Sequence, residues 1–263
     1  MNEDIKHILD RWPYEPGKIT VRRVIGNDGT IKIQMRLNLG LLQMEATGRP
    51  DGLRPRGKES LLDYYEGKLA DHMLRQGTDE GFTVGAQASH ELREEGVQYY
   101  HRYLSNFFLE EHAAVVRDTE RNLRFLDFML KYARHQADRP SLEVYRPYIV
   151  MMNARAKAYL ALEEGDLDRA LAEVNSGLEK IHNFFTEHDQ PQLAQKSNEV
   201  QALLKMQEEL LSQKPRSRLD LLRDRLAQAI ELEDYEQAAR LRDQIRRLEE
   251  SEQASEHPSP ETT

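Results

Sequence analysis

The sequence predicts a mainly α-helical protein with a small N-terminal β-domain, a central helical array and a C-terminal antiparallel helical hairpin. The one convincing strand pattern is an alternation of apolar and polar residues between Lys18 and Leu37. From Ser60 onward, apolar residues instead recur at three- and four-residue steps. Charged residues make up 32% and aromatic residues 7% of the 263 residues, a composition typical of long helices with wide solvated faces.

These patterns divide the chain into four expected segments. Residues 1–58 form an N-terminal basic β-containing domain, residues 59–214 a helical region, residues 215–250 a helical hairpin and residues 251–263 a disordered tail that lacks apolar periodicity. Within the first segment, a short amphipathic helix is expected over residues 2–11, before the breaking sequence PYEPG.

The alternating segment indicates the register of a β-hairpin. A two-residue turn at Asp28-Gly29 would mix apolar and polar side chains on each face, whereas a three-residue loop, Asn27-Asp28-Gly29, keeps the faces separate. The second register pairs Ile25 with Ile31, Val21 with Met35 and Ile19 with Leu37. It places four polar residues together on the other face: Arg22, Lys32, Gln34 and Arg36. Only Arg23 interrupts the apolar row.

A third strand and a turn are expected after this hairpin. Leu41, Leu42 and Met44 continue the strand pattern. The sequence RPDG at residues 49–52 then predicts a turn, because its proline presets φ, its aspartate bonds to its own backbone and its glycine permits a positive φ.

The central region reads as a series of helices. Glu111 marks the expected break between two long helices, and Pro147 is expected to start or kink the helix around it. The expected helical ranges are residues 60–76, two helices within 89–136, and residues 141–165, 166–185 and 190–214.

Residues 153–181 resemble one tetratricopeptide repeat (TPR). Small residues fall where that family places close helix contacts, and Gly165 occupies the turn. The matching positions are Ala154, Ala158, Ala161, Ala170, Val174 and Gly177. The chain departs from the family at Ala161, where an aromatic residue is usual, and it lacks the closing proline. The resemblance implies a TPR-like array of stacked helical pairs; an irregular helical bundle is the alternative.

The C-terminal segment has the pattern of two short antiparallel helices. Ser217 and Asp234 are the expected N-caps. The apolar stripes are Leu219, Leu222, Leu226, Ala229 and Ile230 in the first helix, and Tyr235, Ala238, Ala239, Leu241, Ile245 and Leu248 in the second. These stripes are wider than one seam between two helices requires. In addition, a domain of fewer than roughly 40 residues usually needs further support to fold, and this unit is smaller than that. Some of the apolar surface must therefore be covered by something else.

Residues 217–250 resemble the UVR motif, first described in the B and C subunits of the bacterial UvrABC excinuclease. The resemblance is carried by Leu222, Leu226, Ala229 and the sequence EDYEQAARLRDQIRRL at residues 233–248. In that family the motif is a protein–protein contact element that associates with another UVR-type hairpin. It also occurs in regulators of Clp-type proteases and chaperones, so the resemblance implies interaction and does not by itself imply DNA repair.

The resemblance and the stripes predict a non-enzymatic adaptor of the bacterial cytoplasm that docks through the hairpin. The expected protein-binding residues are Leu219, Leu222, Leu226, Tyr235, Ala239, Arg242, Asp243 and Ile245, with Arg242 and Asp243 setting the register by charge. The partner is another UVR-type protein or a second copy of the chain, in a homodimer. Two functional alternatives are an accessory DNA-binding factor of nucleotide excision repair and a regulator of a Clp-type protease or chaperone. A structural alternative is that the hairpin caps the helical array as its last repeat.

A basic N-terminal surface carries the DNA-binding alternative. Residues 17–58 hold nine basic and three acidic residues, a net +6 in a chain whose net charge is −9. The candidate nucleic-acid-binding residues are Arg22, Lys32, Arg36 and Arg49. Pairing of these cations with acidic groups of the same chain or of a second copy is the favoured interpretation, since few aromatic residues are interleaved for base stacking.

The sequence offers little support for catalysis, metal binding or a membrane. It contains no cysteine. His90, Glu94 and His101 recur on one helix but lack the second histidine of an HExxH motif, and no phosphate loop or nucleophile elbow is present. We therefore predict no catalytic residues, no metal and no cofactor; an enzyme with an unrecognised N-terminal site is the remaining alternative. No basic, apolar leader and no apolar run of about 20 residues is present, which predicts a soluble cytoplasmic protein without a membrane partner.

Overall fold

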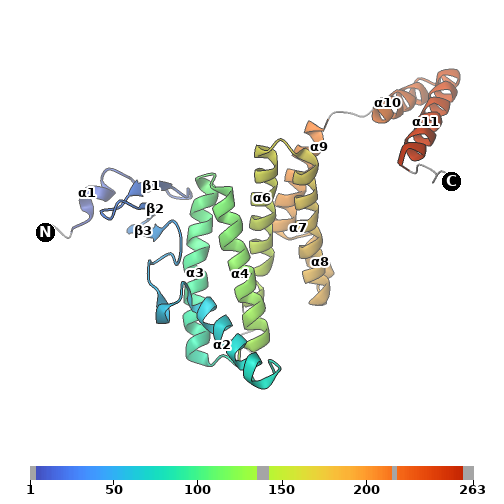
Figure 1. Cartoon of the computed structure of the whole chain (residues 1–263). Helices are drawn as coiled ribbons and strands as arrows, with labels where there is room; N and C mark the ends of the chain where they lie inside the picture. Colours follow the sequence, from blue (N-terminus) through green and yellow to red (C-terminus); the bar gives the residue numbers. More distant parts are fainter. Residues whose placement is uncertain (1–3, 135–141, 215–217, 257–263) are drawn as a thin grey trace, which may run out of the picture. The chain divides into compact units, whose positions relative to one another are not determined.

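The computed structural model describes residues 4–134, 142–214 and 218–256. The chain divides into two units, Met1–Leu211 and Ser212–Thr263, which are described in turn. The described residues confirm the predicted class: they are mainly helical, with one small antiparallel sheet near the N-terminus and a helical hairpin near the C-terminus (Figure 1).

The sheet has the predicted register. The short helix α1 (Lys6–Leu9) precedes three antiparallel strands, β1 (Val21–Ile25), β2 (Ile31–Leu37) and β3 (Gly40–Glu45), in the order β1-β2-β3. Val21 lies opposite Met35, and Ile25 lies opposite Ile31. The N–H of Gly26 donates to the carbonyl of Thr30 at 2.8 Å, and Gly29 adopts a φ of 77°, as a three-residue loop requires. The turn at Arg49–Gly52 also forms, with a φ of 75° at Gly52.

Both faces of β2 are buried, which corrects the expectation of one buried and one polar face. Ile33 and Met35 belong to the core of the first unit, and Lys32, Gln34 and Arg36 on the opposite face are buried as well. The interrupting residue Arg23 forms an ion pair with Glu111 in the loop between two helices. Its charge is thereby neutralised on the face that carries Ile33.

In the described part of the first unit, a series of long and short helices follows the sheet. The predicted break near Glu111 lies between α3 and α4, and Pro147 lies in the first turn of α6. The single helix expected over residues 190–214 is instead two helices, because Ser197 caps the second by accepting a hydrogen bond from the N–H of Val200 at 3.3 Å. The elements are η1 (Pro55–Gly57), α2 (Leu61–Gln76), α3 (Ala86–Phe108), α4 (His112–Tyr132), α6 (Arg146–Glu163), α7 (Leu167–Glu187), α8 (Pro191–Ala194) and α9 (Asn198–Gln213).

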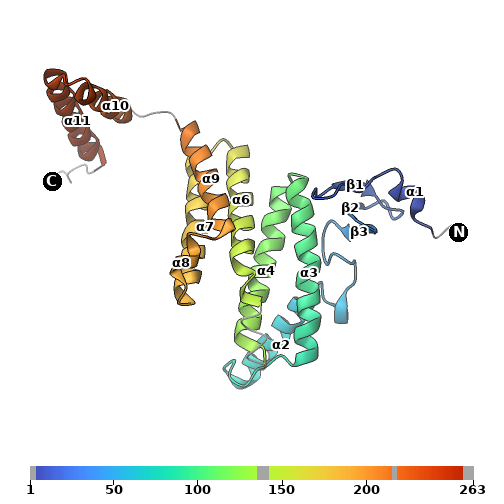
Figure 2. The same cartoon turned by 180° about the vertical axis from the view of Figure 1, so that it is seen from behind.

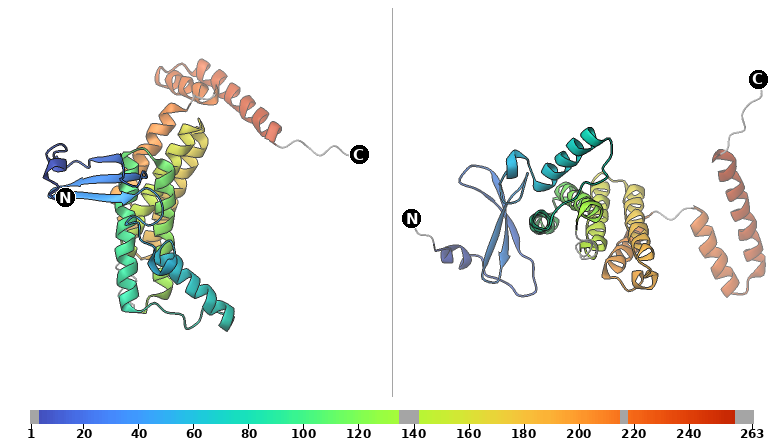
Figure 3. Two further views of the ribbon diagram at one scale, coloured as in Figure 1. Left: turned by 60° about the vertical axis from the view of Figure 1, so that its left-hand side comes forward. Right: turned by 90° about the horizontal axis from the view of Figure 1, so that it is seen from below.

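The long helices of the first unit stand side by side in chain order. Helices α3, α4, α6 and α7 run alternately up and down, and α9 lies beside α7 (Figures 1 and 2). The sheet lies against α3, at the opposite side of the row from α7 (Figure 3). Helix α6 is in the middle of the row and buries residues all around its circumference, from Ile149 to Ala161.

Helices α6, α7 and α9 approach each other closely at Gly177. A Cβ atom added to this glycine would lie 2.5 Å from the Cβ of Ala154 and 3.1 Å from Cδ1 of Leu203. The turn before α7 contains Gly165 with a φ of 77°. The small residues that suggested a TPR thus do allow close helix packing, while the TPR-like array itself stays a prediction.

Two buried ion pairs join the helices to the N-terminal segment. Arg102 donates two hydrogen bonds to Asp118, at 2.7 and 2.8 Å, and a third to the carbonyl of Gly48 at 2.7 Å. Glu95 forms an ion pair with Arg121 and accepts a hydrogen bond from the N–H of Leu61, the first residue of α2, at 2.7 Å. Burial lowers the pKa of Arg121 from its ordinary value, and the charge of Glu95 opposes that shift.

No helix in the part of the chain that the structure describes combines the length and the apolarity needed to cross a membrane.

We predict that Glu95→Gln lowers the free energy of unfolding by roughly 3–5 kcal/mol, because Arg121 would keep a buried charge without its partner. Chemical denaturation of the full chain measures this change. Glu94→Gln, on the exposed side of the same helix, is the matched control and should change stability little. Equal stability of the two variants would contradict a structural role for the Glu95–Arg121 pair.

We predict opposite effects for the same substitution in two helices. Gly177→Ala should lower the free energy of unfolding by about 1–3 kcal/mol, because the new methyl group would overlap Ala154. Gly67→Ala in α2 has no atom within 4 Å of the new methyl group. It should therefore raise stability by about 0.5–1 kcal/mol through helix propensity alone. Thermal unfolding of both variants checks the difference, and a stabilising Gly177→Ala would refute the close packing of α6, α7 and α9.

Candidate protein-binding surface

The second unit is a helical hairpin with a capped turn. Helix α10 (Arg218–Glu231) is followed after three residues by helix α11 (Tyr235–Glu256). The predicted cap forms, since Oδ1 of Asp234 accepts a hydrogen bond from the N–H of Gln237 at 3.0 Å. The N–H of Asp234 also donates to the carbonyl of Ala229 at 2.8 Å. The turn is therefore held at both helix ends, which makes the two helices antiparallel neighbours.

One sequence expectation changes at the end of the hairpin, and two others lie outside the described residues. Helix α11 continues to Glu256, beyond Glu250, where we expected a disordered tail to begin. The helical pattern there is maintained by charged and polar residues with good helix propensity. The predicted cap Ser217 and residues 257–263 lie outside the described residues.

The seam between the two helices is made of a few apolar residues, two of which are small. Ala229, Ala238 and Leu241 form a buried cluster, against which Leu222 and Leu226 pack. Because alanine is small, the two helix axes can approach each other closely where Ala229 and Ala238 lie.

Some of the predicted protein-binding residues take part in this seam. Leu222 and Leu226 are half-buried in it, and Ile245 is buried as well. These three side chains use most of their surface within the hairpin and therefore stabilise it. Leu219 belongs to the helical part of α10, but its side chain lies outside the described residues.

Larger apolar side chains remain outside the seam. Tyr235 is 70% exposed and Ile230 is 55% exposed, and Ala239 is exposed too. Leu221 and Leu232 add further exposed apolar surface. Sequence reasoning selected Tyr235 and Ala239 as contact residues but did not select the other three. The signal for Ile230 was its position directly after Ala229, because one residue step turns a helix by about 100° away from the seam.

Helical geometry places Ile230 and Tyr235 on the same side of the hairpin. Ile230 follows the seam residue Leu226 by four positions, and Tyr235 precedes the seam residue Ala238 by three. Both steps rotate the side chain in the same sense, by about 40–60°. In an antiparallel pair, equal rotations from the seam lead to the same side of both helices. The two largest exposed side chains beside the seam therefore form one surface near the turn.

A stripe along α11 extends this surface. Tyr235, Ala239, Arg242 and Arg246 follow one another at steps of four, three and four residues and are all exposed. We refer to Ile230 and these four residues as the Tyr235 flank. The flank is apolar near the turn and basic farther along α11, so its two ends differ in chemical character.

Asp243 makes two long contacts with arginines of α11, whereas Arg240 forms an ion pair with Glu236. Oδ1 of Asp243 lies 3.9 Å from Nε of Arg242 and 3.9 Å from a guanidinium nitrogen of Arg246. These distances exceed a hydrogen bond, and exposed pairs of this kind contribute little to stability. The predicted charge pair therefore lies at the surface of the hairpin, with Arg242 in the Tyr235 flank and Asp243 next to it.

The candidate nucleic-acid-binding residues on the sheet are engaged within the chain. Nε of Arg22 donates to Oε1 of Gln34 at 2.8 Å, and its guanidinium lies 4.1 Å from the ring centre of Trp12. Nε of Arg36 donates to the carbonyl of Trp12 at 2.7 Å. These two side chains, which the DNA-binding alternative would place against a nucleic acid, hold the N-terminal segment over the sheet, in line with the favoured interpretation of pairing within the chain.

Lys32 and Arg49 are also paired with carboxylates. Nζ of Lys32 forms ion pairs with Glu45 and, at 2.6 Å, with Asp28. The hydrogen bond from Lys32 lowers the pKa of Asp28 to about 2, and the same contact raises the pKa of Lys32. Arg49 lies in the loop after β3, away from the other three, and contacts Glu95 at 3.3 Å. The structure therefore brings Arg22, Lys32 and Arg36 together on the sheet and separates Arg49 from them.

His90, Glu94 and His101, whose spacing superficially resembles that of a metal-binding helix, lie in α3. Within residues 4–134, 142–214 and 218–256, no group of three or more His, Cys, Asp or Glu side chains could hold a metal ion.

Comparison with known proteins supports the identity of the hairpin. The family model described as the UvrB/uvrC motif (UVR) matches residues 216–251, which cover the hairpin described above. No curated protein and no solved structure showed significant similarity to the chain. The chain therefore carries a UVR motif, formed by α10 and α11, at its C-terminal end.

Proposed function

We propose that this protein is a non-enzymatic adaptor that docks onto another protein through the Tyr235 flank of its UVR hairpin. One observation carries the proposal: the seam between α10 and α11 is already closed, yet Tyr235 and Ile230 beside it are 70% and 55% exposed. Burying one large aliphatic side chain completely contributes roughly 1.5–3 kcal/mol, so covering this flank would yield useful binding energy.

The partner that fits this surface is a second helical hairpin of the UVR type. An apolar stripe on an antiparallel helix pair is covered most fully by another helix pair, as in a four-helix bundle. The hairpin also carries nearly balanced charges, with eight basic and nine acidic residues between Arg216 and Glu250. Balanced and alternating charges allow one hairpin to pair with a second copy, and a self-complementary patch gives a twofold dimer. Another UVR-type protein would use the same contacts.

A DNA-contacting role has less physical support. Each of the four candidate cations already makes a polar contact within the chain, so a phosphate would have to compete with Asp28, Glu45, Glu95 or Gln34. Such competition reduces the counterion-release gain that drives binding to nucleic acid.

We predict that the full chain self-associates and that Ile230→Glu combined with Tyr235→Glu abolishes the association. Two charges on the flank would have to be buried without partners, which is strongly unfavourable. Light scattering on the eluting protein measures the molar mass, which should rise with concentration from 30.7 kDa towards twice that value only in the wild type. Circular dichroism verifies that the variant keeps its helices.

The matched control is Leu74→Glu, which introduces the same charge at an exposed position of α2, and it should behave as the wild type. A wild type that stays at 30.7 kDa would exclude the second copy as the partner. Capture of proteins from native lysate then decides the adaptor proposal itself. If the wild type and the double variant retain the same proteins, the Tyr235 flank does not dock.

We predict that the full chain does not bind duplex DNA measurably at physiological salt, because Arg22, Lys32 and Arg36 are held by internal contacts. Fluorescence anisotropy with a labelled duplex measures binding over a range of salt concentrations. Binding that falls steeply with salt and disappears after neutralisation of these three residues would favour the repair-factor alternative.

A further inference from the structure

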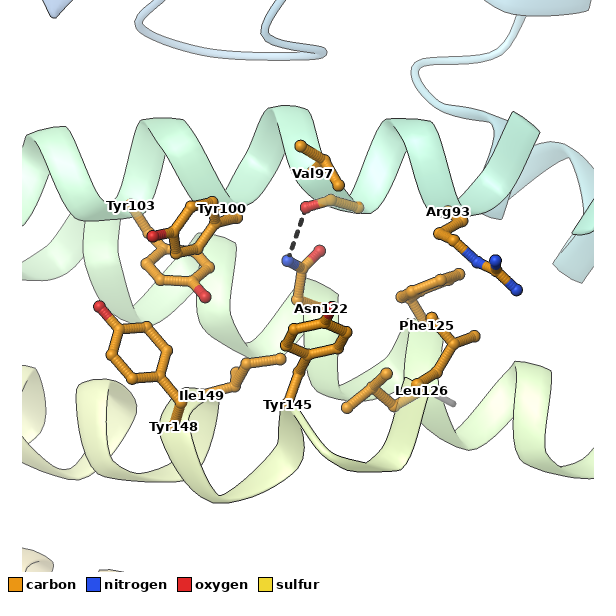
Figure 4. A pocket seen from close by; sticks show the side chains of 12 residues that line it. Arg93, Val97, Tyr100, Tyr103, Asn122, Phe125, Leu126, Tyr145, Tyr148 and Ile149 are labelled. Atoms are coloured by element: carbon orange, nitrogen blue, oxygen red, sulfur yellow. Dashed lines mark hydrogen bonds between the residues drawn. The ribbon is translucent and has the colours of Figure 1, made fainter. Parts of the chain in front are cut away.

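A pocket with a cavity volume of about 450 Å³ lies between α3, α4 and α6 of the first unit. Its wall is mostly aromatic and aliphatic, and Figure 4 shows the side chains that point into it. The volume falls in the range of about 300–1,000 Å³ that is usual for small-molecule sites. The hairpin contributes no residue to this wall, so the pocket is independent of the proposed docking function.

Three tyrosines gather at one end of the pocket. The ring centres of Tyr100 and Tyr103 are 5.6 Å apart, and those of Tyr100 and Tyr148 are 6.2 Å apart. Arg93 lies at the other end, as Figure 4 shows. The pocket therefore has an aromatic end and a basic end, with Phe125, Leu126 and Ile149 between them.

The phenol groups of the buried Tyr103 and the half-buried Tyr148 have unused hydrogen-bonding capacity. Tyr103 is only 1% exposed, and its hydroxyl makes no hydrogen bond with any of the described residues; the same holds for the hydroxyl of Tyr148. Burial raises the pKa of Tyr148 to about 12 and raises that of Tyr103 as well, so both hydroxyls stay protonated at neutral pH and can donate. Each hydroxyl can donate to an acceptor inside the pocket, which makes a ligand that supplies an acceptor at this end favourable.

The remaining polar groups define the charge of a suitable ligand. The amide of Asn122 is already used, because its nitrogen donates to the carbonyl of Gly96 at 3.0 Å and its oxygen accepts from Arg121 at 3.0 Å. Among the described residues that line the pocket there is no carboxylate, and Arg93 is the one charged side chain. A cationic ligand would therefore find no counter-charge, whereas an uncharged molecule pays no ionic desolvation cost.

We propose that this pocket binds a small uncharged aromatic molecule that presents a hydrogen-bond acceptor to the hydroxyls of Tyr103 and Tyr148. Its ring system lies among Tyr100, Phe125 and Ile149, where edge and face contacts with the aromatic side chains are available. Val97 and Tyr145, both exposed and both in the lining, lie where the ligand meets solvent.

The test uses 6-propionyl-2-dimethylaminonaphthalene, an uncharged aromatic probe whose emission moves to longer wavelength when its carbonyl accepts a hydrogen bond. Titration of the full chain should show saturable binding of one probe per chain. Val97→Trp should fill the pocket and weaken binding by at least about tenfold, the effect of losing about 1.4 kcal/mol. Tyr103→Phe with Tyr148→Phe should keep most of the affinity but shift the bound emission to shorter wavelength.

Two controls separate this pocket from other apolar surfaces. Leu74→Trp adds the same side chain at an exposed site outside the pocket and should leave binding unchanged. The Ile230→Glu and Tyr235→Glu variant should bind the probe as the wild type does, even if docking is lost. Binding that is not saturable, that is unaffected by Val97→Trp in a folded variant, or that keeps its emission without the two hydroxyls would overturn the proposal. If Val97→Trp does not fold, Ile149→Phe replaces it as the filling variant.

Discussion

The account depends on one constraint: two short antiparallel helices can share only one seam. In the UVR hairpin this seam is closed by Ala229, Ala238 and Leu241, with Leu222 and Leu226 at its edge. The two alanines let the helices approach each other closely, and the three leucines fill the rest of the seam. Ile230 and Tyr235 therefore remain beside the seam, where only another molecule or another part of the chain can cover them. The close packing of the seam thus leaves Ile230 and Tyr235 exposed, and these two side chains are where we propose that a partner binds.

In the first unit, the apolar faces of the helices are covered because the helices stack against one another. Helices α4 and α6 each pack between two other helices, α3 carries the sheet, and charged groups that become buried in the stack are paired, as Arg102 is with Asp118. Glu95 belongs to the same class, and it also holds the first turn of α2. The described residues of the first unit thus form a helical stack that contains the aromatic pocket. The hairpin belongs to the second unit, which follows in the chain. This division is consistent with the two proposals: ligand binding by the first unit and protein docking by the hairpin.

Local patterns in the sequence predicted much of this fold, because each depends on residues that are close along the chain. The register of β1 and β2 follows from two-residue alternation and one glycine, and the cap at Asp234 follows from its position before an apolar stripe. Long-range contacts could not be predicted. The burial of Lys32 and Arg36 depends on Glu45 and on the backbone of Trp12, and the pocket combines tyrosines from two separate helices. In the hairpin, the pattern predicted the apolar stripe but not which of its members the seam would use.

The most direct test of the central claim is photo-crosslinking from position 235. A photoreactive phenylalanine analogue replaces Tyr235 in the full chain, and Arg240, an exposed residue on the same helix, is replaced in a parallel control. The crosslinked peptides are then identified by mass spectrometry. The account predicts crosslinks from position 235, and not from position 240, to the hairpin of a second molecule. Crosslinks from position 235 that lead only to residues 1–211 of the same polypeptide would show that the chain covers this flank itself, and would contradict the account.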